Sequence, residues 1–89
     1  MIDAKGGDNT AQPRNTRNYV LRDGHEIVYH GITVDIERRV PEHVRSGKEF
    51  TSCTFSRPRT RESARRNEAE AIARYERNQG RKPRYNKQG

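Results

Sequence analysis

The chain has 89 residues, of which 28% are apolar and 35% are charged, and these values allow one domain with a small core. Nineteen Lys and Arg residues oppose twelve Asp and Glu residues; the formal charge of +7 favours a polyanionic partner, nucleic acid first. The single cysteine, Cys53, forms no internal disulfide, which suits a reducing compartment. No apolar run reaches the roughly 20 residues of a membrane span and no signal-peptide core is visible, so we expect a soluble, cytoplasmic protein.

Residues 1–16 show no periodic apolar pattern, and we expect them to form a mobile tail. Two strands are predicted next, over 17–21 and 26–31, because Val, Ile and Tyr dominate these segments. The residues between them, 22–24, read Arg-Asp-Gly, which is typical of a hairpin turn.

The length of this turn decides where two tyrosines point. A two-residue loop would pair Tyr19 with Val28 and send Tyr29 to the opposite face of the sheet. A three-residue loop, with Gly24 in the left-handed conformation, would pair Tyr19 with Ile27 and put both tyrosines on one face. We favour the three-residue loop.

A short helix should follow Asp35, a plausible N-cap residue. Every fourth residue of the segment is apolar, which predicts a buried stripe of Ile36, Val40 and Val44. Arg39 and His43 are also four residues apart and lie on adjoining turns beside that stripe. Pro41 interrupts the segment, so the helix should be short or irregular near His43.

A third strand is predicted over 50–56, where Phe and Thr are frequent, and a long helix from about Thr60 or Ser63 to Gln79. Gly80 follows as its C-terminal cap. Exposed pairs four residues apart are expected at Glu62–Arg66 and Glu70–Arg74. The inner stripe of the helix contains Ala64, Glu68, Ala71, Ile72 and Tyr75.

Glu68 is the exception in that stripe, because burying a carboxylate costs several kcal/mol unless it is paired or holds a cation. Periodicity alone favours an ion pair with one of the many arginines, and a metal ligand is the second interpretation. One cysteine and three scattered histidines match no zinc spacing, and no glycine-rich phosphate loop precedes a helix.

The order and spacing of these residues resemble the GIY-YIG nuclease family over about residues 17–86. "NYV", with Tyr19, corresponds to the first motif and "YHG", from Tyr29 to Gly31, to the second. The first motif lacks its glycine and isoleucine, and His30 stands where isoleucine is usual. Other positions of the family pattern are matched by Arg39, His43, Ala64, Glu68, Ile72 and Asn86.

The resemblance implies an α+β fold, a small three-stranded antiparallel sheet flanked by helices, that hydrolyses DNA phosphodiesters with a divalent metal. Glu68 would be the single protein ligand of Mg²⁺ or Mn²⁺, and Arg39 would bind the scissile phosphate. A tyrosine would position or deprotonate water, with a relay through His43; we favour Tyr19 as the base and Tyr29 as its partner. Gly31 and Asn86 would support the site.

We therefore expect a minimal DNA endonuclease with little readout of base sequence. Phosphate contacts would come from the basic segment before and within the long helix: Arg57, Arg59, Arg61 and Arg65. Specificity would then depend on DNA structure, on a homodimer or on a partner protein. The alternative is a non-catalytic module that binds nucleic acid or another protein on the same scaffold.

Overall fold

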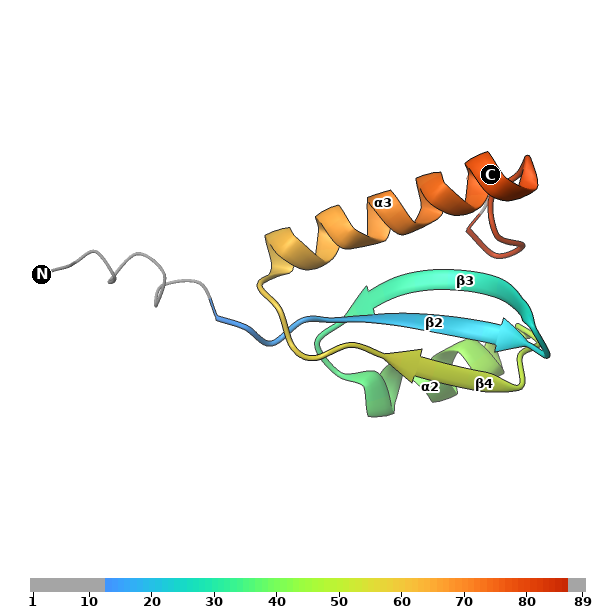
Figure 1. Ribbon diagram of the computed structural model, residues 1–89. Coiled ribbons are helices and arrows are strands. Elements are labelled where there is room, and N and C mark those ends of the chain that lie inside the picture. Colours follow the sequence, from blue (N-terminus) through green and yellow to red (C-terminus); the bar gives the residue numbers. More distant parts are fainter. Residues whose placement is uncertain (1–12, 87–89) are drawn as a thin grey trace, which may run out of the picture.

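The computed structural model describes residues 13–86, so the predicted C-terminal tail, 87–89, and positions 1–12 of the predicted N-terminal tail lie outside the described residues. The elements follow in the order β2 (Arg17–Asp23), β3 (Glu26–Thr33), α2 (Ile36–Arg45), β4 (Ser52–Phe55) and α3 (Arg61–Gln79). The strands form one antiparallel sheet in the order β3-β2-β4, with α3 on one face and α2 on the other (Figure 1). The predicted α+β class is confirmed.

The hairpin register differs from both sequence predictions. Asp23 pairs with Glu26, so the turn is one residue farther along than expected, and Tyr19 pairs with Gly31 rather than with Ile27 or Val28. A β-bulge between Leu21 and Arg22 adds one residue to β3, since the partners of these two residues are Tyr29 and Ile27.

This bulge determines which face Tyr29 occupies. Continued without a bulge, the register of the turn would pair Tyr19 with His30, and Tyr29 would point to the opposite face. The extra residue shifts the pairing by one, so that Tyr19 pairs with Gly31 and Tyr29 points to the same face as Tyr19. The centroids of the two tyrosine rings are 5.9 Å apart. The predicted placement of both tyrosines on one face is confirmed, although the register behind it was wrong.

The hydrophobic core is small and lies mainly between the sheet and α2. Tyr19, Leu21 and Val28 are its fully buried members. Partly buried side chains from the strands, α2, a loop and the C-terminal segment pack against them: Tyr29, Ile36, Phe50, Cys53 and Tyr85. Cys53 is therefore a small core-lining side chain, and burial raises the pKa of its thiol.

The predicted helix cap at Asp35 is confirmed, because its carboxylate accepts a hydrogen bond from the Arg38 amide at 3.2 Å. The helix is short, 10 residues, and continues through Pro41. The predicted apolar stripe is wrong at its last position. Val44 is 59% exposed, and His43 is the residue that α2 buries. The helix thus turns an imidazole, not a third aliphatic side chain, toward the sheet.

The long helix begins and ends close to the predicted positions. The Thr60 hydroxyl accepts a hydrogen bond from the Ser63 amide, and Gly80 closes the helix in the left-handed conformation. The expected Glu62–Arg66 ion pair forms at 3.9 Å. Glu70–Arg74 is not an ion pair within the described part of the chain. The third strand is shorter than predicted, Ser52–Phe55 instead of 50–56.

Two segments outside the named elements complete the domain. Thr16, expected in the mobile tail, is buried and exchanges two backbone hydrogen bonds with Arg59, at 3.0 and 2.7 Å. At the other end, Asn86 covers the outer edge of β3. Its side-chain oxygen accepts from the His30 amide at 2.8 Å and its amide donates to the His30 carbonyl at 2.9 Å. No helix within residues 13–86 is long and apolar enough to cross a membrane.

The Asn86→Ala substitution should lower the free energy of unfolding by about 1–3 kcal/mol, because both hydrogen bonds to the β3 edge are lost. Urea unfolding followed by circular dichroism measures the change. Asn78→Ala, at an exposed position on α3, is the control and should change stability by less than about 0.5 kcal/mol. Equal losses in the two variants would show that Asn86 does not anchor the strand.

Candidate active site

Three aromatic rings from three different elements meet on the α2 face of the sheet. The Tyr19 hydroxyl lies 2.5 Å from Nε2 of His43, in a buried hydrogen bond that joins β2 to α2. The Tyr29 ring, on β3, lies 4.9 Å from the His43 ring between centroids, and the Tyr19 ring lies 5.6 Å from it. We call Tyr19, Tyr29, His43 and the neighbouring Arg39 the phenol–imidazole cluster.

Gly31 makes room for this arrangement. A Cβ atom at this position would lie 2.6 Å from Cζ and the hydroxyl of Tyr19 and 2.6 Å from Cε2 of Tyr29. Such separations are far below van der Waals contact, and both rings are held by packing. The two tyrosine rings therefore occupy the space that any other side chain at residue 31 would need.

Burial controls the protonation of the cluster. It raises the pKa of the Tyr19 phenol well above its usual range, and the nearby Tyr29 adds to the rise. Burial also lowers the pKa of His43, with further lowering by the positive charges of Lys48 and Arg39. Near pH 7 the imidazole is thus neutral and the Tyr19 phenol keeps its proton, so Tyr19 donates to Nε2.

These facts weigh against the prediction that Tyr19 is the catalytic base. Its side chain is only 1% exposed, so water has no approach to it, and its pKa moves away from neutrality. Tyr29 is half-buried and is the more accessible phenol of the pair. Tyr19 is better described as the residue that positions the imidazole of His43.

Arg39 supplies positive charge at the edge of the cluster. Its side chain is 38% exposed, and its Nε lies 3.3 Å from a carboxylate oxygen of Glu42. That contact lacks hydrogen-bond alignment, since Nε is buried and has no hydrogen-bond partner within residues 13–86. The same carboxylate also lies 3.7 Å from Arg38, so Arg39 is only partly neutralised.

Lys48 and Tyr85 adjoin the cluster and were not predicted from the sequence. The Lys48 ammonium lies 5.5 Å from the centroid of the Tyr29 ring and 5.7 Å from that of Tyr85. The Tyr85 hydroxyl accepts a hydrogen bond from the Glu49 amide at 3.0 Å and so holds the loop that carries Lys48. Neither residue is part of a periodic pattern in the sequence, because both lie in irregular segments outside the helices and strands.

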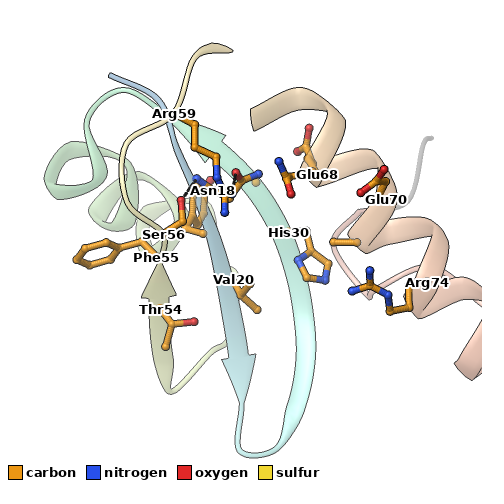
Figure 2. A pocket seen from close by; sticks show the side chains of 14 residues that line it. Asn18, Val20, His30, Thr54, Phe55, Ser56, Arg59, Glu68, Glu70 and Arg74 are labelled. Carbon is orange, nitrogen blue, oxygen red and sulfur yellow. Dashed lines mark hydrogen bonds between the residues drawn. The ribbon is translucent and has the colours of Figure 1, made fainter. Parts of the chain in front are cut away.

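Glu68 lies on the other side of the sheet. It lines a cavity of about 310 Å³ between α3 and the strands, together with Asn18 and Val20, the neighbours of Tyr19 in β2 (Figure 2). Because side chains alternate along a strand, the Tyr19 hydroxyl points away from this cavity. Tyr19, a member of the cluster, and Gly31, which packs against the two tyrosine rings, nevertheless border the cavity.

The environment of Glu68 is that of a partly buried, unpaired carboxylate. Burial raises its pKa, and the charge of Arg65 partly offsets the rise. Within the described residues no ion pair or hydrogen bond holds its carboxylate. The structure brings together Tyr19, Tyr29, Gly31, Arg39 and His43, whereas within residues 13–86 no hydrogen bond or ion pair joins Glu68 to a member of the phenol–imidazole cluster.

Of the four predicted DNA-binding arginines, Arg59 lines this cavity and the other three do not. Arg57, Arg61 and Arg65 are exposed, whereas Arg59 is half-buried and its guanidinium donates to the Asn18 side chain at 2.5 Å. Arg59 also carries the backbone bridge to Thr16, which gives it a structural role. Three of the four side chains are therefore free to reach a polyanion.

Comparison with protein families, with curated proteins and with solved structures finds no match for this chain. Its interpretation depends on its own residues and their geometry.

Gly31→Ala should destabilise the protein by at least about 2 kcal/mol, because the added methyl overlaps both tyrosine rings. Gly24→Ala is the matched control. Gly24 has a positive φ of 65° and open space around it, so alanine there should cost only the conformational penalty of about 1 kcal/mol. Urea unfolding measures the free energy of unfolding of both variants. A smaller decrease in Gly31→Ala than in Gly24→Ala would contradict the close packing of the tyrosine rings against Gly31.

His43 should titrate below the usual histidine pKa of about 6.5. Because the unfolded state then binds more protons, the contribution of His43 to stability is full above pH 6.5 and is lost as the pH falls toward its folded-state pKa. Lys48→Met should move the pKa of His43 upward, since one repelling charge is removed. NMR titration of the imidazole measures both effects, with Arg77→Met on exposed α3 as the control. An unchanged pKa in Lys48→Met would place Lys48 outside the site.

Proposed function

We propose that this protein is a GIY-YIG-type endonuclease that hydrolyses DNA phosphodiester bonds with Mg²⁺ or Mn²⁺ and reads little base sequence. The main support is the phenol–imidazole cluster, in which groups from β2, β3 and α2 meet at hydrogen-bond and ring-contact distances. The formal charge of +7 suits a polyanionic substrate.

Arg39 would bind the scissile phosphate. Its guanidinium stays charged at all relevant pH values and offers a planar set of donors that matches phosphate oxygens. Its side chain is 38% exposed and its charge is only partly neutralised by Glu42, so the guanidinium is accessible to such a ligand. Lys48, whose charge also acts on His43, would add a second cation to the site.

Tyr29 would orient the attacking water, because it is the accessible phenol of the pair. The neutral imidazole of His43 lies against its ring and is positioned by the Tyr19 hydroxyl. A neutral imidazole can accept a proton near pH 7, which a phenol of ordinary pKa does poorly. Because Nε2 of His43 already accepts the hydrogen bond of Tyr19, His43 would take up a proton only if that hydroxyl relays it, and Tyr29 would position the water.

Glu68 fits a single-carboxylate ligand for a hard divalent cation. It is partly buried and unpaired within residues 13–86, and Mg²⁺ commonly binds one or two carboxylates while keeping several waters. When bound, such an ion stabilises the negative charge on the leaving 3′ oxygen. The cavity that contains Glu68 is also lined by Tyr19 and Gly31. This shared lining supports a single site that joins the metal ligand to the phenol–imidazole cluster.

The position of Glu68 also supports a second candidate, a DNA-binding module without catalysis. Its carboxylate occupies the α3 face, whereas the phenol, imidazole and guanidinium groups occupy the α2 face. In this candidate Arg39 and the arginines near α3 bind phosphates, and the phenol–imidazole cluster only stabilises the fold.

Incubation of plain, nicked and branched DNA with Mg²⁺ or Mn²⁺ separates the two candidates. An endonuclease should cut at least one of these substrates, with cutting abolished by a chelator and reduced at least about 100-fold by Glu68→Gln and by Arg39→Gln. Glu62→Gln, on exposed α3, should retain full activity. Metal-independent cutting, or full activity in Glu68→Gln, would refute the metal role of Glu68; binding without cutting would support the module.

DNA affinity should fall steeply with salt, because phosphate contacts supply most of it. Each of Arg57→Gln, Arg61→Gln and Arg65→Gln should reduce the slope of log affinity against log salt by about 0.9. Fluorescence anisotropy at several salt concentrations measures the slope. Arg66→Gln, which removes the partner of Glu62, is the control; a slope that none of the three changes would place the DNA elsewhere.

A further inference from the structure

An exposed aromatic ring lies on the strand next to the one that carries Tyr19. Phe55 ends β4 and is 55% exposed, although it is one of only two phenylalanines in a chain with a very small core. In the sheet it pairs with Tyr19, so the two residues face each other across neighbouring strands. Directly opposed residues lie about 4.5–5.5 Å apart between Cα atoms, so the backbone of Phe55 adjoins that of Tyr19 on the neighbouring strand.

A fixed cation accompanies this ring. The Arg17 guanidinium lies 5.2 Å from the centroid of Phe55, and it donates a hydrogen bond to the Ser56 carbonyl at 2.7 Å. Arg17 is therefore held against the ring by two contacts. An exposed phenylalanine is often only surface, but here the ring is accompanied by a positioned guanidinium and by the exposed Arg57 two residues on.

A partner for such a surface must offer a flat π-face and negative charge together. An unpaired nucleotide has both, because its base stacks on aromatic rings and its phosphate is anionic. Bases within a duplex are already stacked on their neighbours and cannot reach the ring. An acidic protein segment would satisfy the charge but supply no flat face.

We propose that Phe55 and Arg17 form a stacking platform for an unpaired base beside the site of cleavage, which directs the enzyme to DNA with a single-stranded region. The proposal deepens the proposed function and shares its assumption that the partner is DNA. It names the substrate class, which is gapped, flapped or otherwise partly unpaired strands.

The chain contains no tryptophan, so Phe55→Trp introduces a unique fluorescent probe at the platform. Binding is measured without divalent metal, using the same sequence as a single strand, as a gapped duplex and as a full duplex. Anisotropy of labelled DNA reports occupancy independently. At equal occupancy, the single strand and the gapped duplex should quench the indole at least about twofold more than the full duplex. Val44→Trp, at another exposed apolar position, should show no such difference.

Phe55→Leu tests the stacking without a probe. It keeps an apolar side chain but removes the ring, and it should lower the preference for gapped over paired DNA by about 10-fold. Val44→Ala should leave that preference unchanged. Equal quenching by paired and unpaired DNA, or an unchanged preference in Phe55→Leu, would overturn the platform.

The result also separates this inference from the nuclease proposal. Selective quenching without cutting on addition of Mg²⁺ or Mn²⁺ would keep the platform and reject the endonuclease. Cutting without selective quenching would keep the endonuclease and reject the platform. A protein that binds an acidic polypeptide but no DNA of any form would overturn both.

Discussion

The absence of a side chain at Gly31 is the constraint on which the site depends. The volume of one methyl group at that position is already filled by the rings of Tyr19 and Tyr29. Only because both rings settle there can the Tyr19 hydroxyl reach Nε2 of His43 and bring α2 onto the sheet. The packing of α2 against the sheet buries the imidazole, and this burial lowers the pKa of His43 and keeps the ring neutral.

The sheet separates two kinds of chemistry. On the α2 face, two phenols and an imidazole are bordered by Arg39 and Lys48, which make that face receptive to an anion. On the α3 face, Glu68 sits unpaired, within the described chain, in a cavity of about 310 Å³. The cavity on the α3 face reaches Tyr19 and Gly31, the residues that form the cluster on the α2 face or pack against it.

Local signals predicted most of the elements because capping and turn residues act over a few positions. Asp35, Thr60 and Gly80 begin or end their helices as their side chains or backbone freedom require. The register of the hairpin was not predicted, because the extra residue of the bulge, Val28, is fixed by long-range contacts: it is fully buried and its carbonyl accepts from the Tyr85 amide at 2.9 Å. The burial of His43 was not predicted for a similar reason. The four-residue period of apolar side chains along α2 predicted that Val44 would be buried instead.

The sequence by itself determined the class of the fold, the basic charge and the spacing of the residues that could contact DNA. These properties follow from composition and from periods of two and about four residues, which short-range geometry enforces. Only the tertiary structure decided that Tyr19 is buried while Tyr29 is accessible, that Lys48 adjoins the cluster, and that Glu68 lies across the sheet. Such distances are set by long-range packing, which local pattern does not encode.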